Sequence, residues 1–223
     1  MATFSTLDFV IDGGVARITL KRPDAANGIS MQLAQELLQA SLACRCSPEV
    51  RAVLLTGAGR MFCAGGDLNG FVERAADLQA FIKELTTYLH AAIANFAHMR
   101  APLIVAVNGA AAGAGFSLAA CGDLVLAARS AKFSMAYTGA GLVPDGSGSW
   151  FLPRIVGLRR AQELILTNRR LGAGGEPLVA GGGDQVVDRR RGRSLDPRQR
   201  LDGAGGRLVG RGRIRRQRQQ RGV

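Results

Sequence analysis

Residues 103–123 read Leu-Ile-Val-Ala-Val-Asn-Gly-Ala-Ala-Ala-Gly-Ala-Gly-Phe-Ser-Leu-Ala-Ala-Cys-Gly-Asp. The β-branched run after Pro102 has no polar interruption, which predicts a strand buried on both faces. Asn108-Gly109 predicts a tight turn, and the small residues 110–115 predict the opening of a helix whose backbone is closely approached by another group. The unpaired N–H groups and the positive dipole end at a helix start favour an oxygen carrying negative charge as that group.

A second glycine-rich loop lies upstream. Residues 51–56, Arg-Ala-Val-Leu-Leu-Thr, predict another buried strand, and Gly57-Ala-Gly-Arg-Met-Phe-Cys-Ala-Gly-Gly-Asp-Leu68 follows it. If each loop directs one backbone N–H group at the same oxygen, the two loops form an oxyanion hole. The pattern therefore indicates an enzyme that stabilises negative charge on a carbonyl oxygen.

Two other interpretations of the stretch fit less well. A dinucleotide-binding Gly-x-Gly-x-x-Gly motif beginning at Gly113 requires a third glycine where Leu118 stands. A serine hydrolase motif around Ser117 requires a closing glycine where Ala119 stands. Both departures disfavour these classes.

The paired loops resemble those of a known family. Phe62-Cys-Ala-Gly-Gly-Asp-Leu68 together with Asn108-Gly-Ala-Ala-Ala-Gly-Ala-Gly115 is similar to the crotonase superfamily, the enoyl-CoA hydratases and isomerases. The resemblance runs from about Leu7 to Leu171. It implies an α/β fold, a spiral of β-β-α units, with residues 1–171 as an acyl-CoA-binding domain that assembles as a homotrimer or a dimer of trimers. Coenzyme A enters as part of the substrate, and neither a metal nor a separate cofactor is implied.

The rest of the chain predicts an alternation of strands and helices, with ligand loops at strand ends. Hydrophobic periodicity and turn residues place the elements. In order, these are a hairpin of residues 7–12 and 15–20, a helix over 31–44 capped by Ser30, a helix over 72–99, strands over 123–128 and 131–136, and one or two short helices over 150–167 broken at Pro153 and Gly157.

The resemblance also implies which residues form the site. The backbone N–H groups of Gly66 and Ala114 would bind the thioester carbonyl oxygen and hold the enolate, although many relatives have glycine where Ala114 stands. Each such donor is worth roughly 3–4 kcal/mol. The residues implied to line the substrate path are Ala25, Asn27, Ala64, Gly66, Leu68, Ala114 and Tyr137.

The acid-base residues distinguish between reactions. The two glutamates of a family hydratase would fall on Ser117 and Tyr137, which are poor general bases near neutral pH. Asp145 instead matches the catalytic aspartate of family members that move double bonds, so an isomerase is preferred. The alternatives are a hydratase, an inactive remnant of the family, and, for Asp145, a helix cap. His90 and His98 are assigned exposed or core roles.

The C-terminal segment, residues 172–223, differs in composition. It is rich in Gly and Arg and contains no Phe, Tyr, Trp, Met or Lys, so it cannot bury enough apolar surface to fold, which predicts disorder. Residues 171–223 hold 13 Arg and 5 acidic residues, and so carry +8 of the total net charge of +12. A frameshift in GC-rich coding sequence would explain the segment. The alternative is a genuine nucleic-acid-binding tail, although nothing beyond non-specific contact with nucleic acid is expected.

The remaining features indicate a cytoplasmic protein. The N-terminus has no basic stretch followed by a long apolar one, and no apolar run reaches the ~18 residues of a membrane span. The four cysteines, Cys44, Cys46, Cys63 and Cys121, match neither a disulfide framework nor a zinc spacing, and are interpreted as reduced structural thiols.

Overall fold

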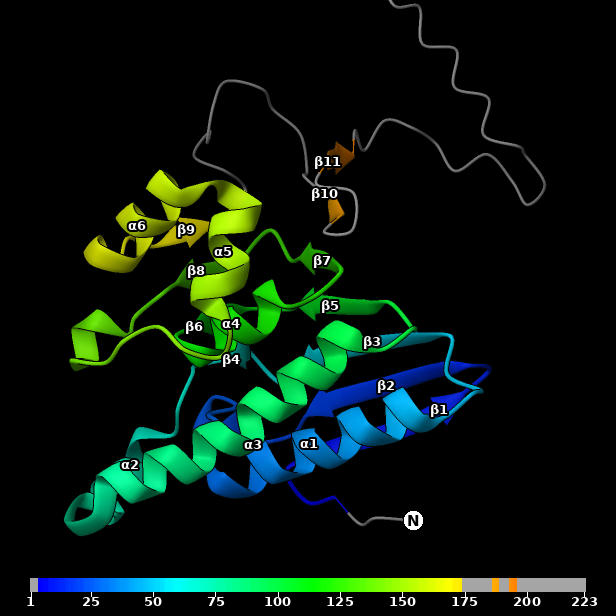
Figure 1. Ribbon diagram of the computed structural model, residues 1–223, viewed down its shortest axis with the longest axis horizontal. Helices are drawn as coiled ribbons and strands as arrows, with labels where there is room; N and C mark the ends of the chain where they lie inside the picture. Colours follow the sequence, from blue (N-terminus) through cyan, green and yellow to red (C-terminus); the bar gives the residue numbers. More distant parts are fainter. Residues whose placement is uncertain (1–3, 174–185, 189–192, 196–223) are drawn as a thin grey trace, which may run out of the picture.

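The computed structural model describes residues 4–173, 186–188 and 193–195. A five-stranded sheet runs through the molecule in the order β1-β2-β3-β5-β7 (Figure 1). The first two strands form the expected antiparallel hairpin, in which Leu7 pairs with Leu20, and the other neighbours are parallel. The strands are β1 Leu7–Asp12, β2 Val15–Leu20, β3 Ala52–Gly57, β5 Leu103–Val107 and β7 Leu124–Ala127.

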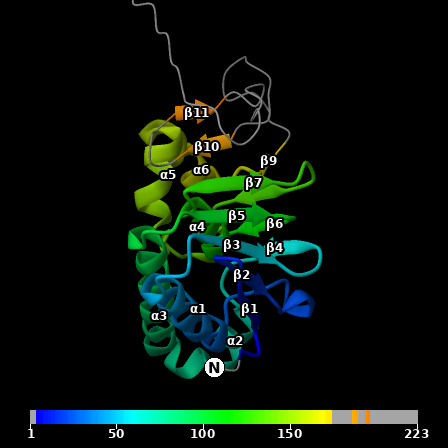
Figure 2. The same ribbon diagram turned by 90° about the vertical axis from the view of Figure 1, so that its right-hand side faces the viewer.

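A smaller sheet lies beside the first and has the order β4-β6-β8-β9 (Figure 2). Its strands are β4 Met61–Cys63, β6 Ala110–Ala112, β8 Lys132–Ser134 and the antiparallel β9 Leu171–Gly172. The chain passes from β3 to β4, from β5 to β6 and from β7 to β8, so each turn adds one strand to each sheet before it reaches a helix. This confirms the expected spiral of β-β-α units.

Two long helices pack side by side against one face of the large sheet (Figures 1 and 2). The Ser30 hydroxyl accepts a hydrogen bond of 3.2 Å from the Leu33 N–H, and so caps the first of them as expected. The helices of residues 4–173 are α1 Met31–Cys46, α2 Leu68–Glu73, α3 Leu78–His98, α4 Ala114–Ala120, α5 Gly148–Val156 and α6 Leu158–Thr167, with 3-10 turns at Pro23–Ala25, Ala75–Asp77 and Thr138–Ala140.

One hydrophobic core joins the sheets to α1 and α3. Its largest fully buried side chains include Phe62, Phe96, Ile18, Leu37 and Leu103. No helix in the described part of the chain is long and apolar enough to cross a membrane.

The start predicted for the helix over residues 72–99 is wrong. Arg74 ends α2, the 3-10 turn follows, and α3 begins only at Leu78. Local side-chain contacts accompany the break, because the Arg74 guanidinium pairs with Asp77 and also lies 5.2 Å from the centroid of the Phe81 ring. These contacts close the corner between the helices, and hydrophobic periodicity does not report them.

Two smaller expectations also need correction. Pro153 lies inside α5 and does not break it, so Gly157 alone separates the last two helices. The turn at Asn108-Gly109 leads first into β6 and only then into α4, because Ala110–Ala112 pair with both β4 and β8.

The C-terminal segment is described at two short stretches beyond Ala173. The strands β10 Val186–Asp188 and β11 Arg193–Leu195 form an antiparallel pair. The rest of the segment predicted to be disordered lies outside the described residues, and the domain boundary at residue 171 stays a prediction.

Candidate active site

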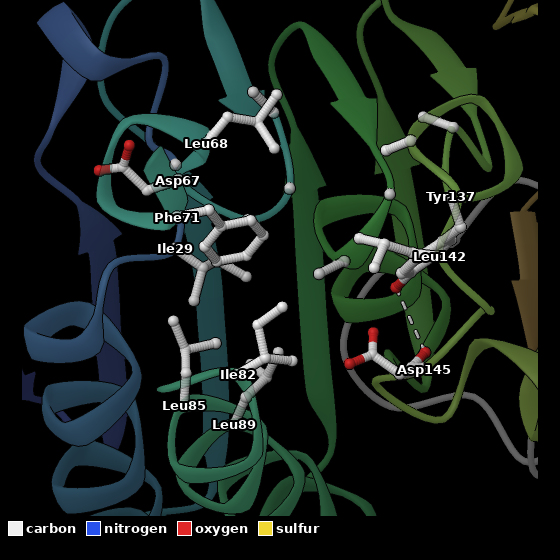
Figure 3. Close-up of a pocket in the computed structure, with 18 of the residues that line it drawn as sticks. Ile29, Asp67, Leu68, Phe71, Ile82, Leu85, Leu89, Tyr137, Leu142 and Asp145 are labelled. Carbon is white, nitrogen blue, oxygen red and sulfur yellow. Dashed lines mark hydrogen bonds between the residues drawn. The ribbon is translucent and has the colours of Figure 1, made fainter. Parts of the chain in front are cut away.

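A cavity of about 570 Å³ opens between α2, α3 and the loops that join the two sheets (Figure 3). Most of the residues predicted for the site line it, although they come from segments far apart in the sequence. These are Ala25, Ala64, Gly66, Leu68, Ala114, Tyr137 and Asp145.

Asn27 is the exception, and its predicted place on the substrate path is wrong. Its side chain is fully buried. The Oδ1 atom accepts from the Arg22 N–H at 2.9 Å, while Nδ2 donates to the carbonyls of Ala58 and Met61 at 2.9 and 2.8 Å. Asn27 therefore ties the loop before α1 to the loop between β3 and β4, behind the cavity wall.

The Gly66 amide is not used by the fold around it. Gly66 forms an isolated parallel bridge with Ile29, in which the Ile29 N–H donates to Gly65 and the Asp67 N–H donates to Ile29. In this pairing the Gly66 N–H has no partner among the described residues. It is therefore available to a group in the cavity.

The Ala114 amide is available for a different reason. Ala114 is the first residue of α4, where N–H groups have no acceptor within the helix. Its loop lies against the loop of Gly66, because a Cβ atom on Gly65 would come within 2.8 Å of the Ala112 oxygen and 3.4 Å of the Ala114 nitrogen. Gly65 also has a φ of 100°, which favours glycine. The two unpaired donors thus lie on adjoining loops and line one cavity.

Two other glycines of these loops, Gly109 and Gly115, serve packing, and for Gly115 this corrects the expectation that a ligand approaches residues 110–115 throughout. A Cβ atom on Gly109 would overlap the carbonyl oxygen of Arg60, and one on Gly115 would overlap that of Cys63. Both glycines therefore allow β6 and α4 to lie directly on β4. In this stretch only Gly113 and Ala114 line the cavity.

Asp145, the carboxylate predicted to act as the base, lines the cavity. Its side chain is 27% exposed, and its Oδ1 atom is buried without a hydrogen-bond partner among the described residues. The N-cap of α5 is Ser147, and no side chain caps that helix. The alternative that Asp145 acts as a helix cap is therefore wrong.

Ser117 and Tyr137 meet at the edge of the cavity, which Tyr137 lines. Their hydroxyl groups are 2.9 Å apart, and both residues are buried. Burial raises the pKa of Tyr137 above its ordinary value, and the negative charge of Asp145 raises it further. A Cβ atom on Gly148 would collide with the Ser117 hydroxyl, so the space around that hydroxyl is closely packed. Tyr137 is therefore even less suited to act as a base than its type suggests.

His90 is the residue that sequence reasoning missed. It lines the cavity from α3, and its Nε2 atom lies 3.4 Å from Asp145 Oδ2. Helical spacing could have placed His90 on the cavity side of α3. Ile82, Thr86 and His90 follow one another at intervals of four residues, and all three line the cavity.

The remaining wall of the cavity is apolar. The side chains of Ile82, Leu85 and Leu89 project from α3 into the cavity, below Ile29 and Phe71 and across from Asp145 and Tyr137 (Figure 3). Asp67, at the other end, pairs with Arg22 at 2.7 Å and accepts from the Asn69 N–H at 3.2 Å. It therefore braces its own loop and caps α2.

The described residues contain neither a disulfide nor a cluster of side chains that could hold a metal ion. The four cysteines are free, and burial raises the pKa of Cys44 and of Cys63 to about 12. No group of three or more His, Cys, Asp and Glu side chains gathers as a metal site in that part of the chain.

Comparison with known proteins gives consistent matches. The family model described as enoyl-CoA hydratase/isomerase matches residues 10–188. A 1,2-epoxyphenylacetyl-CoA isomerase of Escherichia coli is 40% identical over 164 residues, which cover 73% of this chain and 63% of the relative. A 4-chlorobenzoyl coenzyme A dehalogenase-2 of Arthrobacter sp. is 40% identical over 161 residues, covering 72% and 58%.

Solved structures agree with the fold. The crystal structure of an enoyl-CoA hydratase from Polaromonas sp. JS666 has a TM-score of 0.70 and 36% identity, covering 75% of this chain and 65% of that one. The chain spans less than two thirds of the length of these relatives.

Proposed function

Because the chain belongs to the enoyl-CoA hydratase/isomerase family, we propose that it shifts a carbon–carbon double bond in an enoyl-CoA thioester. The observation that carries the proposal is the content of one cavity. It holds two unpaired backbone N–H donors, from Gly66 and Ala114, and the carboxylate of Asp145, one oxygen of which is buried and unpaired.

The proposed reaction needs one base and one oxyanion hole. Asp145 removes a proton from the carbon next to the thioester carbonyl of a β,γ-enoyl-CoA, and the negative charge moves to the carbonyl oxygen. The Gly66 and Ala114 N–H groups stabilise that oxygen by roughly 3–4 kcal/mol each. Asp145 then returns the proton two carbons further along, so the double bond moves to the α,β position and the base is restored.

Hydration is less well supported by the same residues. A hydratase of this family uses a pair of carboxylates to activate water and handle the α-proton, and the corresponding side chains here are Ser117 and Tyr137. Their hydroxyls are hydrogen-bonded to each other, and the pKa of Tyr137 is raised by burial. Neither is suited to activate water near neutral pH.

His90 favours a second candidate function. Hydrolytic displacement of a halide from an aryl-CoA thioester requires a nucleophile and a base that activates water, and Asp145 and His90 lie 3.4 Å apart. The name of the Arthrobacter relative describes a reaction of this kind. In such a reaction chloride leaves and the oxygen of water takes its place on the ring.

We also propose that the chain self-associates. The side chains of Trp150, Leu158 and Leu166 on α5 and α6 are exposed, and a homotrimer or a dimer of trimers would cover such a surface. A cytoplasmic location and the absence of a separate cofactor stay predictions.

The test is to incubate the purified full-length chain with a 3-enoyl-CoA and, separately, with 4-chlorobenzoyl-CoA. Chromatography detects the 2-enoyl product, and chloride release detects dehalogenation. Asp145→Asn should abolish turnover while leaving acyl-CoA binding intact, and Asp24→Asn, at another carboxylate that lines the cavity, is the matched control. Binding without turnover of either substrate would leave the chain an inactive remnant, and full activity of Asp145→Asn would refute the assigned base.

A further inference from the structure

The peptide group between Asp145 and Gly146 is contacted at both of its ends. The Gly146 N–H donates to His90 Nε2 at 3.1 Å, from α3. The Tyr137 hydroxyl donates to the Asp145 carbonyl oxygen at 3.4 Å, from the segment after β8 (Figure 3). The Gly148 N–H donates to the same oxygen at 2.8 Å. One peptide plane is thus held from two separate elements.

The contact with Gly146 fixes the state of the His90 ring. A backbone N–H can only donate, so Nε2 must carry a lone pair and the proton of the neutral imidazole is on Nδ1. In this tautomer Nε2 cannot donate to Asp145 Oδ2, although the two atoms are only 3.4 Å apart. The Asp145 carboxylate therefore keeps its lone pairs for a substrate proton, which a hydrogen bond from His90 would otherwise occupy.

The loop needs such support because its backbone is not locally favoured. Gly146 has a φ of 55° and the next residue, Ser147, has a φ of 63°. Two successive left-handed residues, one of them with a side chain, persist only where surrounding contacts hold them. His90 and Tyr137 supply hydrogen bonds directly before these residues.

We propose that His90 and Tyr137 are positioning residues that clamp the Asp145–Gly146 peptide and thereby aim the Asp145 carboxylate into the cavity. The inference rests on the proposed function for its kinetic consequence, but the clamp itself is a property of the resting protein. In the proposed isomerisation neither residue takes the substrate proton. Each acts through the orientation of Asp145, where an error of about 1 Å costs on the order of 10²-fold in rate.

The first test is kinetic. His90→Ala removes the acceptor and should lower kcat by about 10- to 100-fold with a smaller change in KM, because the substitution changes one side chain of the cavity wall while the proposed oxyanion donors are kept. His90→Gln places an amide oxygen near the position of Nε2 and should restore most of kcat. His98→Ala, on the same helix, is the matched control. Tyr137→Phe should lower kcat in the same way. Wild-type kcat in His90→Ala, or no recovery in His90→Gln, would overturn the proposal.

The second test does not need turnover. The chain has only two histidines, so ¹⁵N-histidine labelling gives two sets of ring signals, and the loss of one set in His90→Gln assigns it. The clamp requires His90 to carry its proton on Nδ1, with Nε2 showing the shift of an acceptor nitrogen. A proton on Nε2 in the neutral protein would overturn the clamp even if isomerase activity is found. An acceptor Nε2 in a protein without activity would uphold the clamp and refute only the proposed function.

Discussion

Replacing Ala114 by proline removes one backbone hydrogen and tests the oxyanion hole directly. The Ala114 N–H has no acceptor among the described residues, so the fold loses no hydrogen bond. Position 114 is the first residue of α4, where proline is well tolerated. The preceding Gly113, at φ 51° and ψ −126°, has no Cβ to clash with the proline ring. We therefore expect Ala114→Pro to fold.

The expected loss of activity follows from the energy of a single donor. An oxyanion-hole donor contributes roughly 3–4 kcal/mol, and a tenfold change in rate corresponds to about 1.4 kcal/mol, so kcat/KM should fall by about 10²- to 10³-fold. Ala114→Gly keeps the N–H and should retain activity within about threefold. The assay is the rate of conversion of a 3-enoyl-CoA by each purified variant.

A stability measurement accompanies the kinetics, because a misfolded variant would also be inactive. The urea unfolding midpoint of Ala114→Pro should match that of the wild type. If the folded proline variant converts substrate at the wild-type rate, the Ala114 amide does not contact the thioester oxygen, and the oxyanion-hole argument fails.

Three further predictions concern stability. Gly115→Ala places a methyl group on the Cys63 carbonyl oxygen and should lower the free energy of unfolding by about 1–3 kcal/mol in urea titrations. Asn27→Ala removes the donor to the carbonyls of Ala58 and Met61, of which Met61 keeps only the 3.5 Å bond from Asn108 Nδ2, and should cost about 1–3 kcal/mol by the same measurement, while Asn27→Asp should not restore the lost bonds. Burial raises the pKa of Glu36, but hydrogen bonds from Thr6 and Ser5 outweigh it, so the net pKa lies below the ordinary value of a glutamate. Glu36 therefore adds stability above its unfolded pKa that is lost as the pH falls through its folded pKa, and Glu36→Gln should flatten this acid limb of the unfolding midpoint, whereas an unchanged limb would contradict the assignment.

The helices and strands that are bounded by turn or capping residues could be predicted from the sequence. The hairpin around Gly13-Gly14 and the Ser30-capped helix follow from turn and capping residues, and the structure has both. The two glycine-rich loops were also recognisable, because close backbone packing excludes side chains wherever the loops cross. That rule does not say whether the neighbour is protein or ligand, which is why the close neighbour of Gly115 was misinterpreted.

The errors at the site come from contacts between distant segments. The sequence placed Asn27 in a polar loop but could not show that its amide would be enclosed by the β3–β4 loop. His90 is 55 residues from Asp145, and only the packing of α3 against the loop before α5 brings the two together. Such a pair has no local signature, and only its helical spacing with Ile82 indicated the cavity-facing side.

The cavity combines main-chain donors with an apolar wall of side chains, and these two parts respond differently to mutation. The two proposed oxyanion donors belong to the main chain, so almost any point mutation at Gly66 or Ala114 other than to proline leaves the hydrogen itself in place. The apolar wall on α3 consists of side chains that can be exchanged one codon at a time. Descendant genes can therefore acquire new acyl-group preferences while the charge-stabilising part of the site is inherited unchanged.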